Sequence, residues 1–532
     1  MHNTLALSLL PTAATGAPAS RVMNDNLFAH FARAFPADRR APLLVTPPGA
    51  AFSYADMEQH CAALAVRLAG LGLVAGDRVT VQVAKSPQAV WLYLACLRGG
   101  YVFHPLNDAY QKDEIAWLVT DAAPALAVCD PARETLFRAL LPAGCRLLTL
   151  GADGEGTLAT DGRTASGAPP LVHRRADDPA ILLYTSGTTG RPKGAVISHG
   201  NLSANVMDLV AAWGFTAADR LLHALPLHHA HGLFVGLGCA LASGASLAFL
   251  PRFDASAVLA MLPDCSVMMG VPTYYTRLLR ESGLDRERCR HMRLFISGSA
   301  PLPPTTFAAF RERTGHELLE RYGMTETGMI CSNPLHGQRR AGSVGRSLPG
   351  VTVRVVGPHG KQLASGEIGE VEVSGANVFH GYWRHAGGRA DSFTDDGFFR
   401  TGDQGWISAD GYLTLSGRSK DLIITGGLNV YPREVENAID GLPGVAESAV
   451  VGVPHPDFGE AVIAAVVAGP GAGPGEAGII AGVKEQLAGF KVPKRVFMLA
   501  ELPRNAMGKV EKTALRTRYA HTFRDGGALN DD

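Results

Sequence analysis

The sequence lacks an excess of charge of either sign. Its 532 residues contain 49 Lys and Arg against 49 Asp and Glu, so the formal net charge is zero. No overall field attracts nucleic acid or an anionic membrane, and we expect neither as a partner. Any anionic ligand must therefore be held by local residues. Charged residues are also few, at 18%, but an apolar fraction of 46% lies in the globular range and excludes a wholly disordered chain.

The cysteines include no pair at CxxC spacing. The eight are scattered along the chain, at Cys61, Cys96, Cys129, Cys145, Cys239, Cys265, Cys289 and Cys331. We interpret them as free, mostly buried thiols, which argues against a disulfide scaffold or a zinc site. Such usage is typical of a reducing compartment and favours a cytoplasmic enzyme.

The length is three to four times that of a typical domain of roughly 150 residues, which predicts two or more domains. No internal repeat is visible. Residues 1–22 contain the apolar run LALSLL, which is too short and lacks the preceding basic residues of a signal peptide. We interpret them as a disordered extension, with a transit peptide as the alternative. We expect a large N-terminal domain over residues 23–417 and a small, mobile C-terminal domain over residues 418–532.

One stretch could be mistaken for a membrane span. No Lys, Arg, Asp or Glu occurs between Arg220 and Arg252, which is long enough to cross a bilayer. However, four glycines, two prolines and a histidine cluster interrupt it, and residues 244–250 have the pattern of a strand after a turn. We predict a buried helix and strand, without membrane insertion.

The pattern of predicted helices and strands changes at two points, near residue 350 and after Arg418. Helical and strand patterns alternate to about residue 350, for example a helix over 54–73 and a strand over 78–83, which predicts layered α/β subdomains with largely parallel strands. Short strands over 351–356 and 369–373 then predict a small antiparallel or barrel-like unit. After Arg418, a helix from Tyr431, strands over 447–453 and 461–467 and a flexible loop over 469–478 predict a small α+β domain.

A glycine-rich loop follows an apolar run that begins at Ile181. Such a loop can wrap phosphate, because glycines let backbone N–H groups approach the oxygens and a lysine supplies a charge. Its candidate residues are Thr185, Ser186, Gly187, Thr188, Thr189, Gly190 and Lys193. Lys193 follows Pro192 and precedes Gly194, whereas the P-loop of NTPases needs Gly-Lys followed by Ser or Thr. A P-loop NTPase or kinase is therefore disfavoured, and an ordinary turn is the other alternative.

Four further motifs accompany this loop. They are Tyr322-Gly-Met-Thr-Glu-Thr327, Thr401-Gly-Asp403, Gly417-Arg-Ser-Lys-Asp421 and Pro503-Arg-Asn-Ala-Met-Gly-Lys509. In this order the five motifs resemble the adenylate-forming superfamily of acyl-CoA synthetases, luciferases and peptide-synthetase adenylation domains. The resemblance covers residues 23 to about 520. It implies an enzyme that joins a carboxylate to ATP as acyl-AMP, releases pyrophosphate and transfers the acyl group to a thiol.

The resemblance also implies roles for individual residues. Lys509 would bridge carboxylate and phosphoryl oxygens, Glu326 would bind Mg²⁺ and Thr325 the phosphate. The remaining ATP-binding residues would be Ser299, Ala300, Pro301, Tyr322, Gly323, Met324, Asp403 and Arg418, with Tyr322 stacked on adenine and Asp403 on the ribose. Lys420 would be the hinge of the small domain, Gly426 and Gly427 would line the tunnel for the CoA pantetheine, and His229 would be the gate between tunnel and acid. Taken singly, each residue could instead have an ordinary structural role.

The strings HALPLHHAHGLF, MGVPTYYTRLL and ERYGMTET look closely like the malonyl-CoA synthetases of this superfamily. There the positions of Arg277, Arg321 and Ser299 grip the distal carboxylate of a diacid, and His231 would join them. Arginine suits that role because its planar fork matches a carboxylate. Surface salt bridges are the alternative for both arginines. The expected substrates are malonate, with methylmalonate tolerated, together with ATP and CoA, in a monomer or weak homodimer.

Other functions stay open at this point. The runner-up is a synthetase for another short acid, such as oxalate or acetoacetate, or an enzyme that loads a carrier-protein thiol. A non-catalytic nucleotide-binding regulator is the alternative outside enzymes, and Glu326, Asp403 and Lys509 argue against it.

Overall fold

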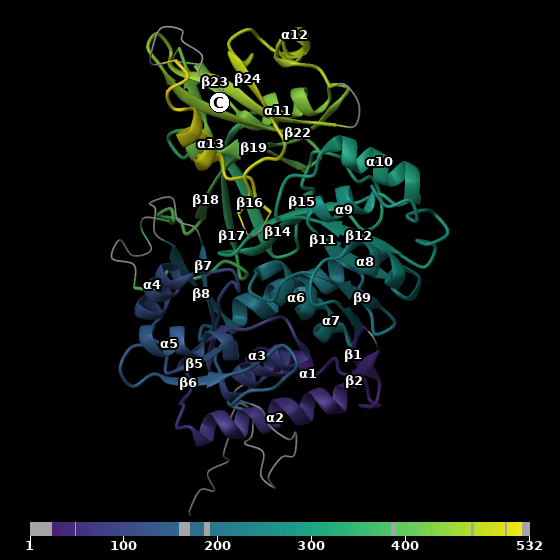
Figure 1. The fold of residues 1–532 in the computed structure, drawn as a ribbon, viewed down its shortest axis with the longest axis vertical. Coiled ribbons are helices and arrows are strands. Elements are labelled where there is room, and N and C mark those ends of the chain that lie inside the picture. The colour runs from purple at the N-terminus through teal and green to yellow at the C-terminus, as the bar shows by residue number, and fades with distance from the viewer. Residues whose placement is uncertain are drawn as a thin grey trace, which may run out of the picture.

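The structure is a computed structural model that describes residues 24–47, 49–158, 171–185, 192–384, 390, 392–426, 428–469, 473–505 and 508–523. The predictions for residues 1–22, for Ser186, Gly187, Thr188, Thr189 and Gly190 of the glycine-rich loop, and for Gly427 lie outside these ranges. Figure 1 shows the C-terminal elements gathered at one end of the long axis, above the sheets formed by the first 418 residues.

The first sheet contains six strands in the order β6-β5-β3-β4-β7-β8, all parallel to their neighbours except the antiparallel pair of β7 and β8. Its strands are β3 (Arg78–Gln82), β4 (Val102–Pro105), β5 (Leu126–Cys129), β6 (Arg146–Thr149), β7 (Pro179–Thr185) and β8 (Lys193–Ser198). The associated helices are α2 (Tyr54–Gly70), α3 (Pro87–Gly99), α4 (Lys112–Ala122), η1 (Pro131–Arg133) and α5 (Glu134–Leu140). The predicted helix over 54–73 and strand over 78–83 are confirmed.

Local signals begin and end these helices. Ser53 forms a capping box with Asp56 at the start of α2, which satisfies N–H groups that have no partner inside the helix. Ser86 caps α3, whose first residue is Pro87, and α3 ends at Gly100 with a φ of 72°. The loop from Gln82 to Ser86 is thereby fixed at both ends, at the carboxyl edge of the six-stranded sheet.

The second sheet contains nine strands in the order β15-β14-β13-β12-β11-β9-β10-β1-β2. The central strands are parallel, and β2, β14 and β15 are antiparallel to their neighbours. The strands are β1 (Pro42–Thr46), β2 (Ala50–Ser53), β9 (Arg220–His223), β10 (Ser246–Phe249), β11 (Val267–Gly270), β12 (Leu294–Ser297), β13 (Leu319–Met324), β14 (Gly328–Ser332) and β15 (Arg346–Ser347). Its helices are α1 (Leu27–Ala32), α6 (His199–Trp213), η2 (His231–Gly236), α7 (Leu237–Ser243), α8 (Ala255–Met261), η3 (Leu262–Asp264), α9 (Pro272–Leu278) and α10 (Pro304–Thr314).

The uncharged stretch between Arg220 and Arg252 lies inside this second sheet. It forms β9, the π-helix η2, α7 and β10, and the side chains of α7 from Leu237 to Ala242 are buried. The prediction of a buried helix and strand is confirmed. Within the described part of the chain, no helix has the length and apolar character needed to cross a bilayer.

A third sheet accounts for the short strands that the sequence predicts after residue 350. The strands β16 (Val351–Val356), β17 (Gly369–Gly375), β18 (Phe399–Ile407) and β19 (Leu413–Arg418) pair antiparallel in that order. Both strands predicted here are present. The sheet ends at Arg418, and the short 3-10 helix η4 (Ser419–Asp421) leads into the C-terminal part.

The C-terminal part is a five-stranded sheet with three helices. Its elements are β20 (Ile423–Thr425), β21 (Leu428–Val430), α11 (Pro432–Asp440), β22 (Val445–His455), β23 (Gly459–Ala468), α12 (Glu476–Gln486), β24 (Arg495–Leu499) and α13 (Lys512–Tyr519). This confirms an α+β unit.

The loop predicted over 469–478 is wrong at its end, because α12 begins at Glu476. The Glu476 carboxylate accepts hydrogen bonds from Arg495 and from the Val496 N–H, and Ile479 and Val483 are buried one turn apart. These tertiary contacts order the turn despite the glycines around it.

Candidate active site

Three of the sequence motifs meet at the Asp403 carboxylate. Asp403 lies in β18 and is 5% exposed. The hydroxyl of Tyr322 in β13 donates to its Oδ2 at 2.5 Å, and Arg418, which lies opposite it in β19, contacts Oδ1 through Nε at 3.0 Å. Asp403 raises the pKa of Arg418, and burial, followed by the Asp403 charge, raises the pKa of Tyr322. Residues predicted to bind adenine and ribose are thus one connected group.

The Glu326 carboxylate lies in the turn after β13 and is also buried. Its Oε1 accepts hydrogen bonds from Tyr382 at 2.9 Å and from Thr185 at 3.3 Å. Lys193 pairs with Thr185 across the hairpin of β7 and β8, and its Nζ lies 5.3 Å from the centre of the Tyr382 ring. Lys193 therefore begins a strand and does not lie within the glycine loop. Among the described residues, no hydrogen bond reaches Oε2 of Glu326.

Lys509 approaches these residues from the C-terminal part. Its backbone N–H donates to Asn505 Oδ1 at 3.0 Å, which holds the loop before α13. The neighbouring Gly508 faces Thr273 of α9, whose Oγ1 lies 3.8 Å from the place that a Cβ on the glycine would take. The Lys509 side chain is exposed on one side, but nearby protein atoms desolvate its amine and lower its pKa. The Arg418 charge also lowers the pKa of Lys509, whereas the carboxylates of Asp403 and Glu326 raise it. The Lys509 side chain therefore keeps access to solvent while it lies close to the charged groups of the site.

Arg321 is the most unusual residue of the site. It lies in β13 and is 3% exposed, and its Nε and Nη2 form no hydrogen bond with any residue that the structure describes. The guanidinium lies against Gly298, where a Cβ would stand 2.4 Å from Cζ, so only glycine leaves room for it. Burial lowers the pKa of Arg321 to about 10, so the group is still a cation at neutral pH. A buried cation with free donors is costly unless an anion joins it.

Ser299 and His231 lie beside this guanidinium. Ser299 Oγ is 3.3 Å from His231 Nδ1, and His231 Nε2 is buried without a partner. Burial, followed by the Arg321 charge, holds the pKa of His231 well below its usual range, so the imidazole is neutral. Ser299 has a φ of 72°, a backbone conformation rare for a residue with a side chain. Strain of this kind occurs where surrounding contacts fix a residue for function.

Arg277 does not join Arg321 in the buried site. It lies in the last turn of α9 and is exposed, and its side chain forms no hydrogen bond or ion pair with the described residues. It follows Thr273 by four positions, so both lie on the helix face that meets the Lys509 loop. Of the two predicted arginines, Arg321 is therefore buried and Arg277 is exposed.

His229 lies near the groups described above, close enough for the Lys509 charge to act on its pKa. It is half-buried, its Nε2 has no partner, and its ring centre lies 4.7 Å from that of His228. Burial, the neighbouring His228 and the Lys509 charge hold the pKa of His229 well below its usual range. His229 is thus a neutral ring near Lys509, and its role as a gate stays a prediction.

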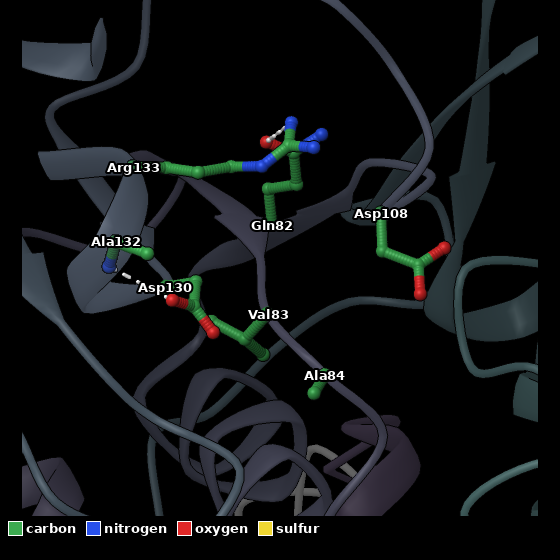
Figure 2. Close-up of a pocket in the computed structure, with 7 residues that line it drawn as sticks. All are labelled: Gln82, Val83, Ala84, Asp108, Asp130, Ala132 and Arg133. Atoms are coloured by element: carbon green, nitrogen blue, oxygen red, sulfur yellow. Dashed lines mark hydrogen bonds between the residues drawn. The ribbon is translucent and has the colours of Figure 1, made fainter.

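A cavity of about 250 Å³ lies at the carboxyl edge of the six-stranded sheet. Figure 2 shows Arg133 and Gln82 joined on one side of it and Asp108 on the other. Burial lowers the pKa of His228, the neighbour of His229, and the Asp108 charge opposes that shift. The sequence reasoning missed this cavity, because its lining comes from the ends of three separate strands and carries no motif.

The remaining predicted residues fall into two groups. Gly323 and Met324 end β13, Thr325 begins the turn that carries Glu326, and Ala300 and Pro301 follow Ser299. A Cβ on Gly323 would lie 2.3 Å from the Gly328 carbonyl oxygen. Lys420 in η4 and Gly426, with a φ of 57°, are exposed in the C-terminal part, and within the described part of the chain neither forms a hydrogen bond or ion pair with the groups above.

Sequence reasoning also missed Tyr382, which donates to Glu326. The only signal for it is an aromatic pair, Tyr382 and Trp383, directly after Gly381 in a segment that otherwise has the pattern of a loop.

Comparison with known proteins matches both parts of the chain to one family. Residues 28–383 match the model of the AMP-binding enzymes and residues 434–509 that of the AMP-binding enzyme C-terminal domain. The chain belongs to the AMP-binding enzymes. The resemblance to the adenylate-forming superfamily is therefore confirmed, and this AMP-binding enzyme is an adenylate-forming acyl-CoA ligase that uses ATP and CoA.

Three relatives illustrate how similar this AMP-binding enzyme is to others. The ATP-bound structure of MatB from Rhodopseudomonas palustris is 49% identical, with a TM-score of 0.91 over 94% of this chain and 100% of that chain. A malonate–CoA ligase of Arabidopsis thaliana is 35% identical over 84% of this chain and 79% of that protein. A sulfoacetate–CoA ligase of Cupriavidus necator is 37% identical over 89% of this chain and 94% of that protein. All three resemble this chain, and the two ligases among them are named for different acids.

Proposed function

We propose that the protein is a malonyl-CoA synthetase. It would convert malonate, ATP and CoA to malonyl-CoA, AMP and pyrophosphate through malonyl-AMP, and would accept methylmalonate, since one extra methyl changes discrimination by only about 1–3 kcal/mol. The observation that carries the proposal is the Arg321 guanidinium, which is buried and keeps two nitrogens without partners.

A dicarboxylate supplies what this guanidinium lacks. The distal carboxylate of malonate can accept a bidentate pair of hydrogen bonds from Arg321, while Ser299 and His231 border it. A monocarboxylic acid such as acetate would leave the buried cation unpaired, at a cost in free energy. Arg277, at the entrance, would add long-range attraction for the dianion, with a smaller effect because it is exposed.

The proximal carboxylate would react with the α-phosphate of ATP near Lys509 and Glu326. Both reacting groups are anionic, so positioned cations make the largest expected contribution to the rate. Lys509 would bridge the two, while Asp403 and Arg418 hold the ribose hydroxyls, Tyr322 stacks on adenine, and Thr325 and the glycine-rich loop bind the phosphates.

Mg²⁺ fits the residues present. A magnesium ion in ATP-using sites is commonly held by one or two carboxylates plus the substrate phosphates. Glu326 is one such buried carboxylate, with Oε1 fixed by Thr185 and Tyr382 and with Oε2 free of hydrogen bonds among the described residues. When bound, the ion would neutralise phosphate charge.

The second half-reaction needs CoA in place of Lys509. Lys509 and the glycine pair Gly426 and Gly427 belong to the same C-terminal part, so a rotation about Lys420 would withdraw the lysine and bring the glycines to the site. His229 would then open the passage between the pantetheine thiol and the acyl-AMP. We expect a cytoplasmic monomer or weak homodimer.

A substrate panel tests the proposal. Purified enzyme is assayed for AMP release with malonate, methylmalonate, succinate, acetate, oxalate, acetoacetate, octanoate and sulfoacetate, with CoA as acceptor. Malonate is expected to give the highest kcat/KM, and AMP rather than ADP is expected as the nucleotide product. Octanoate or sulfoacetate as the best substrate would contradict the malonate assignment. Transfer to a carrier-protein thiol in preference to CoA would instead support the carrier-loading alternative.

A further inference from the structure

A lysine outside every motif of the site makes an unusual contact with a buried histidine. Lys85 lies in the loop between β3 and α3, and His223 is the last residue of β9. Lys85 Nζ is 2.9 Å from His223 Nδ1 and 2.8 Å from the His223 carbonyl oxygen, and it stands 4.3 Å above the centre of the Phe249 ring. The contact joins the six-stranded sheet to the nine-stranded sheet at the carboxyl ends of their strands.

The hydrogen bonds fix the tautomer of His223. Its Nε2 is 2.9 Å from the carbonyl oxygen of Gly232, which can only accept, so Nε2 carries the proton. Burial, followed by the Lys85 charge, lowers the pKa of His223 to about 3, so the ring is neutral and Nδ1 is an acceptor. Lys85 is the donor to Nδ1, and this bond holds the ring in the Nε2–H form.

Gly232 connects this histidine to the acid pocket. It is the second residue of η2, the π-helix that begins at His231, and its carbonyl also accepts the backbone N–H of Leu237. A Cβ on Gly236 would lie 3.0 Å from His223 Cδ2, so the π-helix packs closely against the imidazole. Single π-helical turns are frequent at functional sites. This one begins at His231, whose Nδ1 lies 3.3 Å from Ser299 Oγ.

Lys85 has no donor left for a substrate. Its N–H groups face His223 Nδ1, the His223 carbonyl and the Phe249 ring, and no carboxylate of the described residues forms an ion pair with it. A partly buried amine that lacks a carboxylate partner adds little to the free energy of unfolding, because burial disfavours its charged form. A role in orienting His223 fits these contacts better than a role in stability.

We propose that Lys85 is a positioning residue for the distal end of the acid pocket. It holds His223 in the Nε2–H tautomer, His223 anchors the Gly232 carbonyl, and this anchor sets the position of the His231 ring against Ser299 and Arg321. The inference deepens the proposed function and rests on it for the identity of the acid, but the chain of hydrogen bonds does not depend on which acid binds.

Kinetics of three variants test the proposal. Lys85→Met keeps the apolar stem and removes the donor, His223→Phe keeps the ring and removes both nitrogens, and Lys112→Met, in the exposed first turn of α4, controls for loss of a lysine. We expect Lys85→Met to raise the KM for malonate about tenfold, the order of one lost hydrogen bond to a buried group, and to leave the KM for ATP within about twofold. The double variant Lys85→Met/His223→Phe should be no worse than His223→Phe alone, because both changes interrupt one chain.

A spectroscopic measurement separates this role from a structural one. In protein labelled with ¹⁵N-histidine, the resonances absent from His223→Phe identify His223. We expect a single Nε2–H tautomer in the native protein and a mixture of tautomers in Lys85→Met. An unchanged tautomer, or a KM that rises equally for ATP and malonate with a fall in Tm, would overturn the proposal.

The two proposals can fail separately. A wild-type enzyme that does not use malonate contradicts the proposed function, while the tautomer measurement needs no substrate and still decides the role of Lys85.

Discussion

The Tyr322 hydroxyl donates a 2.5 Å hydrogen bond to Asp403, joining motifs that lie 81 residues apart. Tyr322 supplies an aromatic face and Asp403 a carboxylate, and Arg418 holds the other oxygen of that carboxylate. The bond therefore fixes the orientation of the groups proposed for adenine and ribose before any nucleotide binds.

Tyr322→Phe should weaken ATP binding while the ring stays in place. Loss of a donor to a buried carboxylate costs about 1–3 kcal/mol, so we expect the KM for ATP to rise about tenfold and the KM for the acid to stay nearly constant. The control is Tyr412→Phe, which loses a hydrogen bond to the Gln338 carbonyl instead. Equal effects of both variants on ATP would show that the Asp403 contact is unimportant.

Lys509→Ala should abolish the first half-reaction only. Removal of one group that stabilises transition-state charge costs about 10²–10³-fold in rate, so pyrophosphate release from ATP and malonate should fall by that factor. Conversion of supplied malonyl-AMP and CoA should continue, because the lysine is withdrawn in that step. Lys484→Ala, on the exposed face of α12, is the control. Loss of both half-reactions would contradict the role proposed for Lys509.

Arg321→Met should separate activity from stability. The variant removes a buried cation without a partner, so its Tm should equal or exceed that of the wild type. The kcat/KM for malonate should fall at least about 30-fold, since truncating one partner of a buried charge pair costs 2 kcal/mol or more. Arg277→Met, at the exposed position, should cost about fivefold or less. If Arg321→Met keeps the wild-type kcat/KM for malonate, the assignment of the acid pocket is wrong.

Glu320, next to Arg321 in β13, should make stability depend on pH. It is buried, its Oε1 accepts a hydrogen bond from the Leu302 N–H, and burial raises its pKa from 4.5 to about 7. The unfolded chain therefore releases this proton from about pH 4.5, while the folded protein retains it to about pH 7. The contribution of Glu320 to the free energy of unfolding is present below pH 4.5 and is lost as the pH rises to 7, on the order of 3 kcal/mol in total.

Glu320→Gln removes this titration. Urea unfolding at pH 5 and pH 8 should show that the variant gains stability relative to the wild type as the pH rises. A difference between the two proteins that is the same at both pH values would mean that Glu320 is already ionised in the folded state.

Much of the site could be predicted because short motifs carry local geometry. Tyr322 and Glu326 lie on one strand and its turn, and Thr185 and Lys193 on one hairpin, so their spacing along the chain fixes their spacing in space. Capping residues such as Ser53 and Ser86 act within one helical turn, which is why the helix beginning at Tyr54 was predicted correctly.

The sequence by itself determined the residue types, the order of the motifs, the free cysteines and the division into α/β and α+β parts, because periodicity and motif spacing are local properties. Only the tertiary structure decided that Arg321 is buried and Arg277 exposed, that Tyr382 reaches Glu326, and that Lys85 holds His223 across two sheets. Those contacts join segments far apart in the chain, and both burial and hydrogen bonding between such segments depend on how the sheets pack.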